Sequence, residues 1–191
     1  MTSIAPERRV LADVLGSSRV RDASLVLGGA AFTGALSQVV VPLPFTPVPL
    51  SLGTFAVLLV GATLGPLRGT LAMLLFLGAG VAGVPWFAEQ GSGWQLASFG
   101  YVVGYVAAAG LVGALAAKRA DRSPLRMAGT AVLATLVVYA GGVPWLMAFA
   151  GVGLGEALVL GVVPFLIGDA LKAVAAAGLL PLTWRLVGRL P

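Results

Sequence analysis

Long apolar stretches alternate with short polar or proline-rich gaps along almost the whole chain. A helix that crosses a membrane needs about 20 predominantly apolar residues, and fewer where protein buries its end. By that measure the sequence contains six candidate spans, at residues 23–41, 52–64, 68–84, 99–117, 126–148 and 158–186. The pattern therefore predicts an all-α membrane protein with six transmembrane helices.

Prolines and glycines mark the ends of these spans. The first span stops at residues 42–50, PLPFTPVPL, because a run with four prolines cannot continue a helix. Gly65 and Pro66 end the second span in the same way. Ahead of the first span, residues 10–17 are expected to form a short surface helix.

Composition agrees with a membrane protein. Of the 191 residues, 59% are hydrophobic and only 10% are charged, whereas a soluble domain carries about 25% charged residues. The net charge of +5 would also suit a nucleic-acid binder. Because the basic residues lie in the gaps between apolar spans, they indicate membrane topology and contacts with anionic lipid, and no nucleic-acid partner is expected.

The basic residues also predict an orientation. With the N-terminus inside, the inner segments carry eleven of the twelve Lys and Arg residues, and the twelfth is Lys172. The positive-inside rule therefore places both termini in the cytoplasm. We expect a cytoplasmic N-terminal segment over residues 1–22 and a transmembrane domain over residues 23–191. The eleven inner residues are Arg8, Arg9, Arg19, Arg21, Arg68, Lys118, Arg119, Arg122, Arg126, Arg185 and Arg189.

Several kinds of chemistry are excluded by what the chain lacks. It has no Cys and no His, which removes disulfides, thiolate catalysis, His acid–base chemistry and most transition-metal sites. No segment resembles the phosphate-binding loop that ends in Gly-Lys-Ser/Thr. We therefore expect no enzyme activity, no metal and no cofactor, and any ATP used in transport must be hydrolysed by another chain.

One pair of opposite charges stands out inside an apolar span. Asp169 and Lys172 are three residues apart in the last span and so share one helix face. At 1.5 Å per residue they lie roughly 8 and 12 Å below Pro164, in the outer half of the membrane. A purely structural ion pair is the alternative, but such pairs give little net stability. An ionisable residue at this depth favours a polar binding cavity reached from outside.

The predicted outer side is also rich in aromatic residues. An aromatic belt at the membrane interface would account for most of them, and the walls of a ligand pocket would use the same set. Both interpretations remain open from the sequence alone. The residues are Phe45, Trp86, Phe87, Trp94, Trp145, Phe149 and Phe165.

Four blocks of the sequence together resemble a known family. They are VPLPFTPVPLSLGTFAVLLVGATLGPLRG, GVPWFAEQGSGW, FGYVVGYVAA and GDALKA. Their content and order resemble the biotin-specific substrate-binding subunit (BioY) of energy-coupling-factor (ECF) transporters. The resemblance implies a six-helix, multi-pass subunit of the bacterial cytoplasmic (inner) membrane that captures biotin from outside. It also implies a membrane coupling subunit and two cytoplasmic ABC-type ATPases as partners. Only the two ATPases would use ATP.

The resemblance assigns ligand contacts to two residues of the last span and one residue of the fourth span. Asp169 and Lys172 match the acid and the lysine of the family's last helix, which are expected to meet polar atoms of biotin. The ureido ring offers two N–H donors and a carbonyl acceptor, so a carboxylate and an ammonium suit it. Tyr101 lies in the block that is expected to line the pocket.

Further positions follow from the loops of the family. Phe45, Thr46 and Pro47 belong to the loop that is expected to close over the ligand. Glu89 and Gln90 follow the VPWFA segment, where relatives often place a polar contact residue, and which of the two serves is left open.

Four more positions complete the comparison with the family. Trp86 is expected at the pocket wall. Ala31 and Ala35 match the small-x-x-x-small pattern by which such subunits dock on the coupling protein. Gly53 departs from the family, because a polar side chain is expected there.

Three other functions are alternatives to biotin capture for an ECF transporter. One is a related capture subunit for another vitamin, such as thiamine or riboflavin. Another is a biotin carrier that acts alone as an oligomer. A membrane-embedded enzyme is disfavoured, because a single carboxylate at membrane depth without His or Cys leaves few catalytic arrangements.

Overall fold

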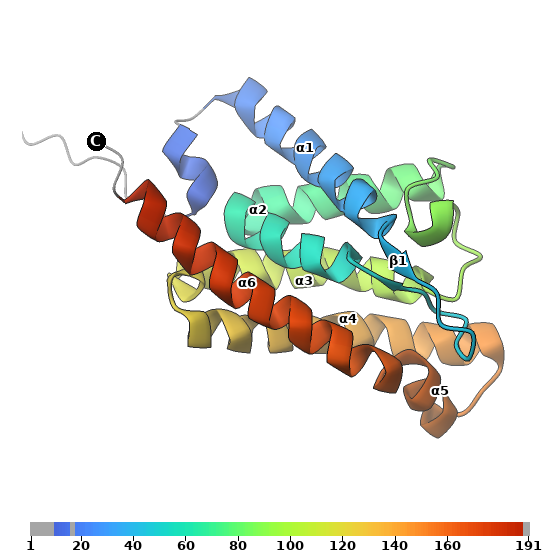
Figure 1. The fold of residues 1–191 in the computed structure, drawn as a ribbon. Helices are drawn as coiled ribbons and strands as arrows, with labels where there is room; N and C mark the ends of the chain where they lie inside the picture. The colour runs from blue at the N-terminus through green and yellow to red at the C-terminus, as the bar shows by residue number, and fades with distance from the viewer. Residues whose placement is uncertain (1–9, 16–17, 189–191) are drawn as a thin grey trace, which may run out of the picture.

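Helices make up most of the computed structural model, which describes residues 10–15 and 18–188 (Figure 1). The long helices are α1 (Arg19–Ser37), α2 (Gly53–Val81), α3 (Phe99–Ala117), α4 (Pro124–Ala150) and α6 (Leu166–Val187). The short elements are η1 (Leu11–Leu15), β1 (Val40–Val41), β2 (Leu50–Ser51), η2 (Ala88–Gln90), η3 (Ala120–Arg122), α5 (Leu154–Gly161) and η4 (Val163–Phe165).

Four helical stretches of the described residues are long and apolar enough to cross a membrane. They are Gly53–Val81, Phe99–Ala117, Pro124–Ala150 and Leu154–Val187. Helix α1 is not among them, because Arg19, Arg21 and Asp22 make its first turn strongly polar. The predicted all-α membrane class is therefore confirmed.

Helix α2 consists of two arms that fold back on each other at Gly65. The backbone of Gly65 has φ 84° and ψ 179°, a conformation that only glycine adopts without strain, and Pro66 begins the second arm. A methyl group on Gly69 would come within 3.1 Å of Gly61 Cα, although eight residues of straight helix span about 12 Å. Figure 1 shows the two arms side by side, at the place where the sequence predicts separate spans.

The connections gather at two opposite ends of the bundle (Figure 1). One end holds η1, the start of α1, the bend of α2, the α3–α4 connection and the end of α6. The other end holds the β1–β2 hairpin, the segment that contains η2, and α5. The described Lys and Arg residues other than Lys172 lie in the elements of the first end. Arg8, Arg9 and Arg189 lie outside the described residues.

Some predicted boundaries are wrong for local reasons. The first span does not continue to residue 41, because α1 ends at Ser37 and Val40–Val41 pairs with Leu50–Ser51 as a short antiparallel hairpin. The last span is interrupted near its start. The chain leaves the helical conformation at Val162, just before Pro164, so that α5 and η4 precede α6.

The segment before α1 also differs from the expected surface helix. Residues 11–15 form a 3-10 turn, and residues 16 and 17 lie outside the described residues. Val10 is only 4% exposed and packs on Gly65 at the bend of α2. Arg68 of the second α2 arm bridges Asp13 and Asp22, each at 3.2 Å. The turn thereby covers the bend of α2.

The far end of α6 is fixed to the α3–α4 connection. The Trp184 indole N–H donates to the carboxylate of Asp121, which is fully buried in η3. The guanidinium of Arg122 lies 4.1 Å from the centre of the Trp184 ring, which adds a cation–π contact. Burial raises the pKa of the Asp121 carboxyl. These contacts hold one end of the helix whose other end carries Asp169 and Lys172.

Substitution of Gly113 tests the bend of α2. A methyl group at Gly113 of α3 would lie 2.4 Å from Gly65 C and Pro66 N, which are backbone atoms and cannot rotate away. Gly113→Ala should therefore lower the free energy of unfolding by about 1–3 kcal/mol. Thermal unfolding of the purified protein in detergent measures this.

Gly129→Ala is the matched control, because nothing lies within 4 Å of a methyl group at that position of α4. It should leave stability unchanged or raise it by up to about 1 kcal/mol through better helix propensity. Equal stability of the two variants would contradict the tight packing of α3 on the bend.

Candidate functional site

Asp169 and Lys172 lie in the first two turns of α6 and form a buried ion pair. The Lys172 Nζ is 3.1 Å from Asp169 Oδ1, and the two side chains are 9% and 11% exposed. The predicted sharing of one helix face is therefore confirmed. The position near the helix N-terminus favours the carboxylate.

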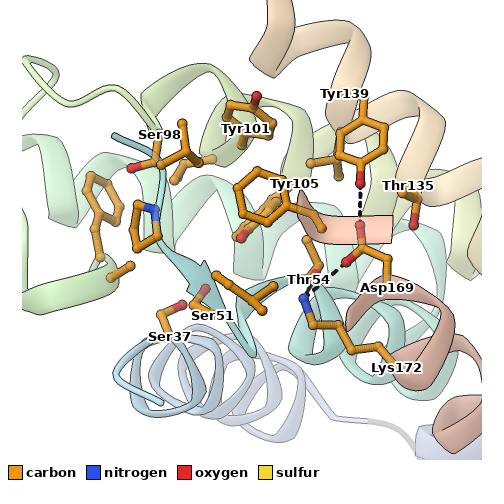
Figure 2. Close-up of a pocket in the computed structure, with 18 of the residues that line it drawn as sticks. Ser37, Ser51, Thr54, Ser98, Tyr101, Tyr105, Thr135, Tyr139, Asp169 and Lys172 are labelled. Atoms are coloured by element: carbon orange, nitrogen blue, oxygen red, sulfur yellow. Dashed lines mark hydrogen bonds and ion pairs between the residues drawn. The ribbon is translucent and has the colours of Figure 1, made fainter. Parts of the chain in front are cut away.

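Two further helices complete the polar contacts of this pair (Figure 2). The Tyr139 hydroxyl of α4 donates to Asp169 Oδ2 at 2.5 Å. The Lys172 ammonium donates to Thr54 Oγ1 of α2 at 2.8 Å. The hydrogen bonds therefore run from Tyr139 through Asp169 and Lys172 to Thr54, and they join α4, α6 and α2.

The ammonium retains capacity for a ligand. A lysine ammonium has three N–H donors, and the described residues accept from two of them, through Asp169 and Thr54. The carboxylate likewise has lone pairs beyond the two bonds it accepts. A molecule beside the pair can therefore both donate and accept without breaking the existing bonds.

A cavity lies directly beside the pair. Its remaining polar side chains are hydroxyls, from Ser37, Ser51, Thr54, Ser98 and Thr135. Its aromatic walls come from Phe76, Phe87, Tyr101, Tyr105, Tyr139 and Phe165. Mostly apolar walls with a few converging polar groups are typical of a small-molecule site.

Tyr101 lies where the sequence analysis expects it, in the cavity wall. The side chain is 6% exposed, and its hydroxyl donates to the Gly161 carbonyl at 2.9 Å. Its ring meets the Tyr139 ring edge to face at 6.4 Å. The Tyr101 hydroxyl is thus already bonded to the protein backbone, so a ligand in the cavity would contact the Tyr101 ring.

The predicted loop residues Phe45, Thr46 and Pro47 do not line the cavity in the described structure. Phe45 is 62% exposed. Thr46 donates to the Leu160 carbonyl at 2.7 Å and so ties the hairpin to α5. The later part of the same hairpin, residues 48–51, faces the cavity instead.

The predicted contacts after the third span are also displaced by a few residues. Trp86 donates to the Phe76 carbonyl at 2.8 Å and packs on Gly34, while Glu89 and Gln90 are exposed. In the described structure these three do not reach the cavity. The neighbouring Phe87 and Ala88 line it.

Gly53 lies where three hydroxyls converge. A methyl group at Gly53 would come within 2.7 Å of Tyr105 Oη, 2.9 Å of Ser37 Oγ and 3.2 Å of Ser51 Oγ. These hydroxyls fill the space that a larger side chain would need. The departure from the family pattern is therefore accompanied by a cluster of uncharged polar groups at the same place.

Ala31 and Ala35 lie on the outward face of α1. Both are exposed, whereas Gly29, Thr33 and Gly34 of the same helix are buried against α2 and Trp86. The small-x-x-x-small pattern therefore faces away from the bundle and leaves room for a neighbouring helix.

Tyr139 and Thr54 are the polar partners that the sequence analysis missed. Each is a hydroxyl residue within a mostly apolar helix, where a polar group needs a partner. That need was the available signal. It did not say which helix would supply the partner.

Comparison with known proteins identifies the class. The BioY family model matches residues 8–189, so the chain belongs to the BioY family. With its apolar helices, it is a multi-pass membrane protein of a transporter family and not an enzyme.

Individual relatives agree with the family assignment. "Probable biotin transporter BioY" of Pyrococcus horikoshii is 35% identical over 163 residues, covering 83% of this chain and 93% of the relative. "Biotin transporter BioY" of Thermotoga maritima is 34% identical over 140 residues, covering 72% and 81%. The crystal structure of an S-component for biotin from an ECF-type ABC transporter shares the fold, with a TM-score of 0.72 at 23% identity, covering 87% and 92%.

The hydrogen bond from Tyr139 should contribute strongly to stability. Tyr139→Phe leaves one oxygen of a largely buried carboxylate without its donor. Loss of a hydrogen bond to a charged group costs about 1.5–3 kcal/mol, so the free energy of unfolding should fall by that amount. Chemical or thermal unfolding in detergent measures the change. Thr135→Val, one turn earlier on α4, removes a hydroxyl that does not bond to Asp169 or Lys172, so it should lower the free energy of unfolding less. The reverse order would refute the assignment.

Proposed function

We propose that this chain is the substrate-binding membrane subunit that captures biotin from the extracytoplasmic side for uptake by an ATP-driven ECF transporter. The observation that carries the proposal is the buried Asp169–Lys172 pair beside an aromatic-walled cavity. The family membership and the named biotin transporters among its relatives support the choice of ligand.

The chemistry of the cavity suits the two parts of biotin. Asp169 accepts from a ureido N–H, and the remaining donor of Lys172 serves the ureido carbonyl. The thiophane ring and the aliphatic chain are apolar, and they fit between aromatic walls such as Phe76, Tyr101 and Tyr105.

The proposed topology has six crossings. They are α1, the two arms of α2, α3, α4 and α6, with α5 at the outer surface. The basic end of the bundle then faces the cytoplasm together with both termini, as the positive-inside rule requires. Residues 1–22 form a cytoplasmic segment and residues 23–191 the transmembrane domain, in the cytoplasmic membrane of a bacterial cell.

The proposed partners lie on the same side as the basic end and along α1. A transmembrane coupling subunit docks on the outward face of α1 that carries Ala31 and Ala35. Two cytoplasmic ABC-type ATPases hydrolyse ATP, and this subunit needs no cofactor of its own. Competition among vitamins separates biotin from the other possible ligands, thiamine and riboflavin. Uptake measured without partner subunits tests the alternative of a biotin carrier that acts alone as an oligomer.

Binding measurements on site variants test the proposal. Asp169→Asn and Lys172→Met should each weaken biotin binding at least tenfold, because each removes one charge-assisted hydrogen bond to the ureido ring. Radiolabelled biotin and purified protein in detergent give the dissociation constants. Leu171→Ala is the control, because this neighbour on α6 is 67% exposed and is not among the described residues that line the cavity.

Two results would count against the proposal. Wild-type affinity in both variants would remove the pair from the site. If the wild-type protein fails to bind biotin but binds another vitamin tightly in the same assay, that vitamin would be the ligand instead.

The proposed topology predicts the labelling of single cysteines. The chain has no cysteine of its own, so Ser92→Cys and Lys118→Cys, at exposed positions in opposite ends of the bundle, each add one thiol. In intact cells a membrane-impermeant maleimide should label the first variant and not the second. After cell lysis both should react. Labelling of Lys118→Cys in intact cells would reverse the orientation.

A further inference from the structure

The cavity has two chemically different ends. In Figure 2 the pair of Asp169 and Lys172 lies at one end, Ser98 lies at the other, and Tyr105 lies between them. Among the described residues that line the cavity, Asp169 and Lys172 are the charged ones, and their charges sum to zero. The cavity as a whole therefore carries no net charge to attract an anion.

The charged end is better suited to a neutral group than to a carboxylate. Lys172 already donates to Asp169 and Thr54, which leaves one donor for a ligand. A ligand carboxylate at that donor would lie beside the Asp169 carboxylate, and like charges at close range repel each other. A neutral group with both donors and an acceptor uses the free capacity of both residues and brings no repulsion.

The opposite end offers no cation in the described structure. Ser98 precedes the first turn of α3, and the other described residues that line the cavity include no Lys or Arg besides Lys172. A carboxylate buried there without a counter-charge would be costly. The N-terminus of α3 would favour an anion by about thirtyfold at most, which is less than the cost of burying an unpaired carboxylate. A carboxylate at this end is therefore best left in contact with water.

From this arrangement we infer that the site recognises the cyclic urea and does not require the acid, so that neutral carboxyl derivatives of biotin, its amides and esters, are ligands of nearly the same affinity. The inference rests on the proposed function, since it takes biotin as the parent ligand. It extends the substrate class from one acid to ureido compounds whose far end is uncharged.

A series of ligands tests the inference on the unaltered full chain. Biotin, biotinamide and biotin methyl ester compete with radiolabelled biotin for the purified protein in detergent micelles at neutral pH. The dissociation constants of the amide and the ester should lie within tenfold of that of biotin. Weakening by more than tenfold for both would show that the carboxylate is bound by the protein, and the inference would be wrong.

A ligand altered at the other end is the matched control. In 2-iminobiotin the urea becomes a cationic guanidinium while the carboxylate is kept, so it should bind more than tenfold more weakly than biotin. If 2-iminobiotin binds as well as biotin and the amide does not, the ligand lies in the reverse orientation and the inference fails.

A variant assigns the contact to Lys172. Lys172→Met should weaken biotin and biotinamide by the same factor, within threefold, because the lost donor serves the ureido carbonyl of both. A loss more than threefold greater for biotin than for the amide would place the carboxylate on Lys172 and overturn the inference. If biotin itself does not bind the wild-type chain, the proposed function fails; if only its neutral derivatives fail to bind, the inference alone is wrong.

Discussion

The need to neutralise two buried charges in an apolar bundle governs the arrangement of the site. A carboxylate and an ammonium at membrane depth are costly unless each is paired and hydrogen-bonded. Here Asp169 and Lys172 pair with each other, and Tyr139 and Thr54 bond to them from two other helices. The side chains of α2, α4 and α6 must therefore meet at one place, and the cavity lies where they meet.

That meeting depends on backbone features far from the charges. Thr54 belongs to the first arm of α2, which is held against the second arm by the bend at Gly65. The bend is packed by Gly113 on one side and by Val10 on the other, and Arg68 just beyond it bridges Asp13 and Asp22. At the same end of the bundle, Trp184 and Asp121 fix α6. The polar site near one end thus depends on contacts at the opposite end.

The sequence was sufficient to predict the helical class, the break at Gly65 and the charged pair, because each breaks a strong local pattern. A charge in an apolar span is conspicuous, and proline after glycine ends a helix. Tyr139 and Thr54 were missed because membrane helices are apolar both towards lipid and towards the core, so the pattern does not reveal which face points inward. The loop contacts were misplaced because the register of the short hairpin, Val40 opposite Ser51, decides which part faces the cavity.

The hydrogen bonds within the Asp169–Lys172 pair limit what it can bind. Asp169 and Lys172 bond to Tyr139, Thr54 and each other, so the protein itself uses part of their hydrogen-bonding capacity. A ligand can therefore use only the remaining donor of Lys172 and the remaining lone pairs of Asp169. This limited capacity restricts which ligand groups the pair can bind. A neutral polar ring adds hydrogen bonds without disturbing the balance of charge, whereas an ion of either sign would disrupt it.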